Sequence, residues 1–328
     1  MKKLSRNKKI LIIALTSLGL LSIASATSVL WNNKIQNSAK KEFQKSFQSQ
    51  IDPHLKNLVN WYFDDDQNQI NDFYTTEQQN NDLLLKELKS TLILAPLWDV
   101  SVIDKAGDKE KQVYKSINLL KNIIKNNWFW FLNNLDKFQF LYNPYGAMYS
   151  DDYPTSPKDI LTKIQTKISN NETLLINNST KKIQNIYEFE VPDTKYDVWS
   201  NKKILFFQLG QNKFIPLLKF NKENKKYLQV LPEMLVMHTT IKTKDALQKF
   251  LNAALVNNLK IQNDYIEYQM KLQPDFNIED YKRDSNDQYY FSIFDGYNYS
   301  ESFKNAINQI QTEGIIMERY TWGYINEK

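Results

Sequence analysis

The feature that most constrains this chain is an uncharged run near its amino terminus. Residues 10–30 (ILIIALTSLGLLSIASATSVL) contain no Asp, Glu, Lys or Arg. As a helix rising about 1.5 Å per residue, the run spans about 30 Å, which is the thickness of the hydrocarbon core of a bilayer. Five basic residues lie within residues 2–9, and basic residues favour the cytoplasmic side. The pattern predicts a single-pass membrane segment with the bulk of the chain outside the cell.

Two other interpretations of this run stay open. Small residues at Ala24-Ser25-Ala26 are typical of a signal-peptide cleavage site, and cleavage there would remove the segment. The run would also suit a buried helix of a soluble protein, although such helices rarely follow five basic residues at a chain start. Apolar sequence continues to Leu30, and Trp31 follows where interfacial aromatics are favoured. These two features favour an uncleaved signal-anchor.

Charge and composition exclude several classes of function. Five of the 42 Lys and Arg residues precede residue 10, and the remaining 37 equal the 37 Asp and Glu residues. The rest of the chain is therefore neutral, and we expect no nucleic-acid partner. The absence of cysteine excludes disulfides, thiol catalysis, iron–sulfur clusters and a lipoprotein anchor. With only 7 Gly and no phosphate-binding or nucleotide-binding motif, we expect no cofactor.

Hydrophobic periodicity divides the chain into four parts. Residues 1–31 are the predicted membrane segment, and residues 32–53 form a polar stalk. Residues 54–178 show helical periods, whereas residues 179–328 favour antiparallel strands with packed helices. The fold class is therefore α+β, with an amino-terminal membrane helix, a helical region and then an antiparallel sheet with packed helices.

Capping residues, prolines and turns set the expected bounds of the elements. Thr76 with Gln79 matches a capping box, Gly314 is expected to end a helix, and Pro216 favours an edge position or a bulge in its strand. The expected helices cover residues 76–94, 109–140 with a break near 126–127, 156–169, 244–272 and 300–314. The expected strands cover residues 183–191, 204–209, 214–220, 227–237, 289–294 and 314–324.

The most distinctive segment is Trp128–Tyr145 (WFWFLNNLDKFQFLYNPY). On a helix, one face would carry Trp128, Phe131, Leu132, Leu135, Phe138 and Tyr142. The first interpretation is a helix buried at the centre of the protein, because large apolar rings favour the core. The second is that some rings line a groove for a sugar or a peptide, and the third is a loop that dips into the membrane.

The candidate ligand-binding residues come from this segment and from the loop after it. They are Trp128, Trp130, Tyr142, Tyr145, Asp151 and Asp152. Two carboxylates near aromatic rings are what a glycosidase uses, but adjacent acids are also common in ordinary loops. No motif of a hydrolase, kinase or nucleotide-binding enzyme is present, and we assign no catalytic residue.

No metal site is expected. His54 and His238 lie far apart in the chain and match no zinc-binding pattern. Asp64, Asp66 and Asn68 alternate as calcium ligands do, but the Gly and Glu that a calcium-binding loop requires are missing. We interpret this acidic stretch as a solvated loop between helices.

The aromatic block within residues 126–146 (NWFWFLNNLDKFQFLYNPYG), the Lys- and Asn-rich composition, the lack of cysteine and the amino-terminal apolar run together resemble the mycoplasmal aromatic motif membrane proteins. The resemblance implies a wall-less bacterium and exposure of residues 32–328 to the host side. It implies no established activity and no catalytic residues.

These features predict a membrane-anchored, surface-exposed protein. We expect a binding or interaction module with a host or envelope ligand, either a protein or a glycan, and the membrane as a partner through residues 10–30. Two alternatives stay open. One is a structural or assembly component of the envelope, and the other is an exported hydrolase that uses carboxylates such as Asp151 or Asp152.

Overall fold

The structure is a computed structural model that describes residues 46–89, 126–144, 157–178, 180–191, 195–196, 202–222, 224–231, 233–281, 294 and 301–325. Residues 1–45, which hold the expected membrane segment and most of the stalk, lie outside this set, and so does most of the strand expected at residues 289–294. Across the ranges that are described, no helix is both long and apolar enough to cross a membrane.

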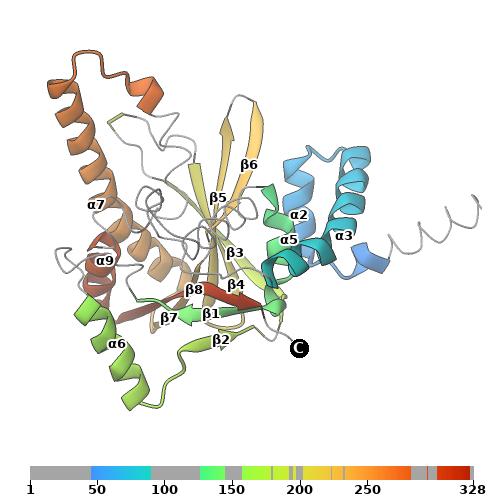
Figure 1. The fold of residues 1–328 in the computed structure, drawn as a ribbon, viewed down its shortest axis with the longest axis horizontal. Coiled ribbons are helices and arrows are strands. Elements are labelled where there is room, and N and C mark those ends of the chain that lie inside the picture. Colours follow the sequence, from blue (N-terminus) through green and yellow to red (C-terminus); the bar gives the residue numbers. More distant parts are fainter. Residues whose placement is uncertain are drawn as a thin grey trace, which may run out of the picture.

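Helices and strands alternate irregularly along the chain (Figure 1). The helices are α2 (Pro53–Tyr62), α3 (Gln67–Lys89), α5 (Trp128–Asn133), the 3-10 helix η2 (Leu135–Lys137), α6 (Pro157–Ser169), α7 (Thr243–Leu272) and α9 (Glu301–Gln311). The strands are β1 (Phe138–Tyr142), β2 (Leu175–Asn177), β3 (Ile183–Glu190), β4 (Lys202–Leu209), β5 (Lys213–Lys222), β6 (Lys225–Val230), β7 (Glu233–Thr239) and β8 (Ile315–Ile325).

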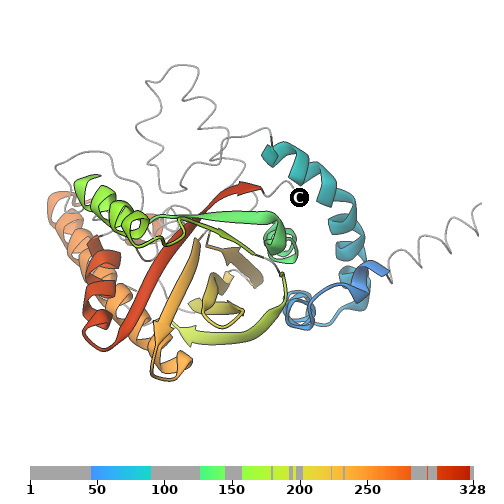
Figure 2. The same cartoon turned by 90° about the horizontal axis from the view of Figure 1, so that it is seen from below.

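All the strands that the structure describes belong to one antiparallel sheet. The order is β2-β1-β8-β7-β5-β4-β3, and β6 pairs with β5 beside this path. The last strand, β8, lies between β1 and β7, so it joins the first half of the chain to the second. The sheet curls strongly when seen from below (Figure 2). Helices with an eight-stranded antiparallel sheet confirm the α+β class.

Both faces of the sheet are buried. Leu205 and Phe207 of β4 belong to one hydrophobic cluster, and Ile204 and Phe206 belong to the other, because successive side chains of a strand point to opposite faces. Helices α2, α3 and α5 lie on the first side, and α7 and α9 lie on the second (Figure 1). This double burial explains why the middle strands are continuous apolar runs.

Most of the expected strands and the later helices are confirmed. The apolar stretch at residues 227–237 divides into β6 and β7. The expectation for Pro216 is wrong, because β5 is paired on both sides and is not an edge strand. Pro216 lies where the second neighbour changes from β7 to β6, and its carbonyl accepts a hydrogen bond from the Leu231 N–H at 2.9 Å. Its missing N–H therefore breaks no ladder bond.

The expectation of a long helix over residues 109–140 is wrong at the carboxyl-terminal end of that range. Helix α5 ends at Asn133, and β1 begins at Phe138. Phe138 and Tyr142 are four residues apart, a spacing that suits one face of a helix as well as one face of a strand. Phe140 decides between the two, because it is buried beside them as alternation requires.

The predicted start of α3 is also wrong. The Asp66 carboxylate accepts hydrogen bonds from the N–H groups of Asn68 (2.9 Å) and Gln69 (3.2 Å), so the helix begins ten residues before the expected cap. Thr76 lies inside the helix and its hydroxyl donates to the Asp72 carbonyl. Asp66 with Gln69 and Thr76 with Gln79 both match the capping pattern, and the helix begins at the first pair.

Candidate functional site

Helix α5 fills the space between the α2–α3 hairpin and the sheet with aromatic rings. Trp128 is 3% exposed and stacks on Phe73 of α3, with the ring centroids 6.1 Å apart. Trp130 is 1% exposed and meets Phe138 edge-on at 5.7 Å. A helix of six residues is too short to be stable alone, so α5 depends on the burial of these rings.

The aromatic cluster is the set of mutually contacting rings around α5. Its members are Phe47, Trp61, Tyr62, Phe63, Phe73, Tyr74, Trp128 and Phe129. Each contact is stacked, tilted or edge-to-face, which are the arrangements that the ring quadrupole favours. The cluster is contributed by segments from residue 47 to residue 129, so it forms only after α2, α3 and α5 have come together.

Polar contacts attach this hairpin to the sheet. Asp52 caps α2 by accepting from the His54 N–H, and its second oxygen accepts from the Ile183 N–H of β3, both at 2.9 Å. At the other end of α2, the amines of Lys219 and Lys226 lie 4.5 and 5.2 Å from the centre of the Trp61 ring.

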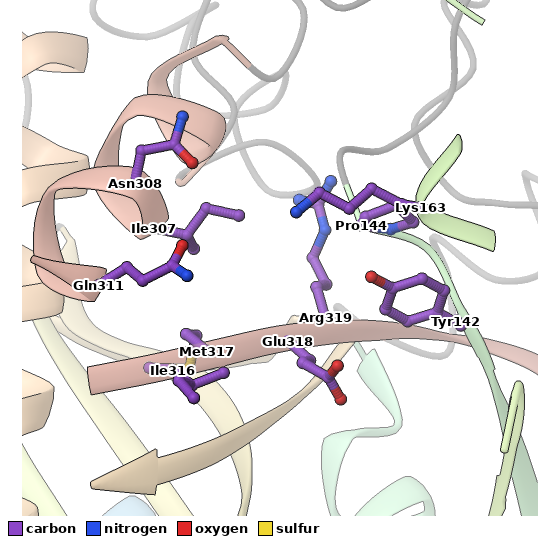
Figure 3. Close-up of a pocket in the computed structure, with 10 residues that line it drawn as sticks. All are labelled: Tyr142, Pro144, Lys163, Ile307, Asn308, Gln311, Ile316, Met317, Glu318 and Arg319. Atoms are coloured by element: carbon purple, nitrogen blue, oxygen red, sulfur yellow. The ribbon is translucent and has the colours of Figure 1, made fainter. Parts of the chain in front are cut away.

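A pocket of about 110 Å³ lies beside β8, on the far side of the sheet path from β3. Helix α9 forms one wall, and α6 with the end of β1 forms the other (Figure 3). Its lining includes Tyr142, Pro144, Lys163, Ile307, Asn308 and Gln311, together with residues 316–319 of β8. The pocket therefore brings together residues that are more than 170 positions apart in the chain.

Lys167 of α6 organises the charges at one end of the pocket. Its amine forms ion pairs with Glu172 and Glu318, both at 2.7 Å, and lies 4.8 Å from the centre of the Tyr142 ring. Burial disfavours the charge of Lys167, but the hydrogen bonds that its amine donates to the two carboxylates outweigh burial and raise its pKa above the usual range. Burial and the nearby Glu318 charge raise the pKa of the Tyr320 hydroxyl. Tyr320 therefore stays neutral and Lys167 stays charged at physiological pH.

Arg319 forms part of the pocket floor and is fully buried. Its Nε donates to the Asn143 carbonyl at 3.2 Å, and Nη1 lies 3.6 Å from the Glu233 carboxylate. The guanidinium also lies 4.2 Å from the centre of the Phe303 ring. A planar guanidinium combines these three contacts as an ammonium cannot, so Arg319 ties β8 to α9, β7 and the end of β1.

Three polar side chains at the pocket rim are not engaged elsewhere. Lys163, Asn308 and Gln311 are exposed, and none of their side chains forms a hydrogen bond or an ion pair with the residues that the structure describes. They point toward the pocket from its two walls (Figure 3). The rim thus offers one cation and two amides to an incoming ligand.

Comparison with known protein families supplies the context for these two features. The family model described as aromatic cluster surface protein matches residues 30–241. The match covers more than half of the chain and includes the aromatic cluster. The chain belongs to the aromatic cluster surface protein family. Neither the curated proteins nor the solved structures yield a match.

Membership of the aromatic cluster surface protein family confirms the family part of the sequence-based resemblance and fits exposure at the cell surface. The match includes α2, α3, α5 and the strands from β1 to β7, and it ends before α7. The pocket therefore combines residues from both sides of the limit of the match. Tyr142 and Lys163 lie within the matched residues, and the lining residues of α9 and β8 lie beyond them.

The structure separates the candidate ligand-binding residues of this aromatic cluster surface protein. Trp128 and Trp130 lie in the core, whereas Tyr142 lines the pocket. Tyr145, Asp151 and Asp152 lie outside the described residues. Among the residues that are described, no group of three or more His, Asp or Glu side chains is arranged to hold a metal ion. In the acidic stretch, Asp66 caps α3 and Asp64 pairs with Lys226.

Sequence reasoning missed most of the pocket. Lys163 and Glu318 have no local motif, and they line the same pocket only because β8 inserts beside β1. Arg319 offered one signal, because it is one of only three arginines in a chain with 42 basic residues. An arginine in a lysine-dominated chain indicates a position where the planar guanidinium is needed.

Proposed function

We propose that this aromatic cluster surface protein is anchored in the membrane by residues 10–30 and displays the rest of the chain outside the cell as a binding module. The uncharged run behind five basic residues supports the anchor. Membership of a surface protein family supports the display. The ligand is a host or envelope molecule, and neither a nucleic acid nor a cofactor is involved.

The pocket beside β8 is the proposed ligand site. The observation that carries this proposal is the set of unengaged polar side chains at its rim, Lys163, Asn308 and Gln311, above an apolar wall that includes Ile307. A few convergent polar groups around an apolar surface are what binding sites share. The rings of the aromatic cluster, in contrast, hold the module together.

Trypsin treatment of intact cells tests the display. The chain has 42 Lys and Arg residues, so an exposed module is expected to be cut while a cytoplasmic control protein survives. If the module is cut only after lysis, the orientation is wrong, and a scaffold on the cytoplasmic face becomes the better proposal.

Ligand capture by the full chain tests the site. The full chain in lipid nanodiscs is expected to retain a host or envelope component, and Asn308→Trp is expected to reduce that binding at least tenfold by filling the pocket. Gln309→Trp is the matched control, because residue 309 is also exposed on α9 but does not line the pocket. Equal binding by both variants would remove the pocket from the proposal.

A further inference from the structure

Strand β8 is paired along only part of its length on one side. It pairs with β7 from Ile315 to Thr321. On its other side, β1 pairs with β8 only from Tyr320 to Ile325. Strand β1 ends at Tyr142, and Pro144 has no N–H to continue a ladder. Among the residues that the structure describes, none pairs with residues 315–318 on this side. We call this stretch the open edge of β8, and the pocket lies along it.

The main-chain groups of Met317 point toward this open edge. The Met237 N–H donates to the Asn212 carbonyl at 2.8 Å, so the main-chain groups of Met237 face away from β8. Antiparallel ladders alternate, and Met237 lies opposite Met317, so the main-chain groups of Met317 face away from β7. The Asn143 N–H donates to the Arg319 carbonyl at 3.0 Å, which gives the same direction two residues later.

Met317 is only 5% exposed, and its main-chain N–H and C=O form no hydrogen bond with any part of the chain that the structure describes. Buried main-chain groups are nearly always paired, with protein, ligand or water. Ile315, two residues earlier, is covered completely. Ile315 does not line the pocket, so Met317 is the position where an unpaired donor and acceptor border it.

We propose that the open edge of β8 binds an extended, acidic peptide segment of a partner protein, which adds to the sheet as a short strand in line with β1. This inference rests on the proposed function and names the partner class. Strand addition provides main-chain hydrogen bonds for affinity and side-chain contacts for specificity. The main chain of an extended peptide supplies a donor and an acceptor at the spacing that Met317 presents.

The size and charge of the pocket favour a peptide over a small molecule. Pockets that enclose a small molecule measure about 300–1,000 Å³, whereas this one measures about 110 Å³. It is large enough for a strand that lies across it and contacts it through one or two residues. Lys163 at the rim attracts an acidic side chain, and Ile307 and the half-exposed Ile316 offer apolar contacts on either side.

A library of linear twelve-residue peptides, panned against the full chain in nanodiscs, provides the probe. We expect acidic peptides whose binding falls at least tenfold in Asn308→Trp and is unchanged in Gln309→Trp. Lys163→Glu is expected to change the selected peptides from acidic to basic, whereas Lys244→Glu on α7 is the matched control and should not. Selection of no peptide, or of peptides indifferent to Asn308→Trp, overturns the proposal. So does a neutral glycan that binds in their place.

The binding mode has its own test. Methylation of one backbone nitrogen at a time along a selected peptide is expected to weaken binding at least tenfold at alternate positions, because only alternate N–H groups face β8. Hydrogen exchange at Met317 should slow when the peptide binds. An effect without alternation, or a Met317 amide already protected in the free chain, contradicts strand addition. Neither outcome depends on trypsin shaving, so failure of this inference is distinct from failure of surface display.

Discussion

The two sides of the sheet are covered by helices that bury different kinds of side chain. On the side of α2, α3 and α5, the buried helical residues include Trp128 and Trp130. On the side of α7 and α9, they include Ala246, Ala253 and Ala254. Among the described residues, every buried tryptophan belongs to the first cluster and every buried alanine to the second.

The difference follows from the shape of the covering helices. Helix α7 has 30 residues and is regular, so alanines let its backbone approach the sheet closely. Helix α5 has only six residues with which to fill the space between α2, α3 and the sheet (Figure 1). Large rigid rings fill such space with few residues. The side of α7 and α9 (the helical side) therefore relies on regular packing. The side of α2, α3 and α5 (the aromatic side) relies on individual rings.

Removal of one buried ring is expected to cause the largest loss of stability. Trp130→Ala is expected to lower the free energy of unfolding by about 4 kcal/mol, because it deletes a buried indole and leaves a cavity. Leu247→Ala on α7 is the counterpart and is expected to cost about 3 kcal/mol. Urea unfolding of both variants checks the order. A loss below about 1 kcal/mol for Trp130→Ala would contradict the dependence on individual rings.

Much of the fold was predictable because local patterns agreed with it. The strands β3 to β7 are apolar runs bounded by turns, and α7 ends two residues before Pro274. Where prediction was wrong, two local solutions competed. Phe138 and Tyr142 fit a helix and a strand equally well, and pairing of this segment with β2 and β8 selects the strand.

A buried acid gives the aromatic side a pH response. Burial raises the pKa of the Glu77 carboxyl on α3 from 4.5 to about 7. Between these values the folded state holds a proton that the unfolded state has lost, so stability falls as pH rises through this window, by about 3 kcal/mol in total at about 1.4 kcal/mol per pKa unit.

Glu77→Gln should remove this response, because the amide mimics the protonated acid. At pH 4 the variant is expected to match the parent, and at pH 8 it is expected to be more stable by about 3 kcal/mol. Asp72→Asn, an exposed position of the same helix, serves as the control. Denaturant unfolding across the pH range provides the measurement, and a variant that follows the parent curve at every pH would refute the assignment.

The candidate site was harder to predict than the fold because its residues meet only through topology. Tyr142 was named from the sequence as one of several aromatic candidates. Lys163 and Asn308, in contrast, look like ordinary surface residues in the sequence. The open edge of β8 arises because β1 is five residues long and β8 is eleven. The lengths of two strands that are far apart in the chain set that mismatch, and no local motif records it.

At Gly314, on the helical side, backbone conformation matters more than ring packing. Gly314 ends the turn from α9 to β8 with φ +78°, a region that side chains with a Cβ adopt at a cost. A Cβ there would meet only the Thr240 hydroxyl at 4.0 Å, so Gly314→Ala is expected to lose about 1.5 kcal/mol through backbone strain alone. Thermal unfolding checks this value, and Gly314→Asn should recover part of it because Asn tolerates this conformation.

Coupling between neighbouring rings on the aromatic side has the smallest expected effect. If the rings of the aromatic side stabilise one another beyond simple burial, then Phe73→Leu and Trp128→Leu should not be additive. The stacked pair is expected to show a coupling of about 1 kcal/mol in a double-mutant cycle, as ring pairs do. The counterpart on the helical side pairs Leu251→Ala with Phe220→Leu, two buried residues of the second cluster without a ring-to-ring contact between them. Coupling near zero in both cycles would mean that the tryptophans contribute volume alone, and that α5 would accept any apolar side chains of the same size.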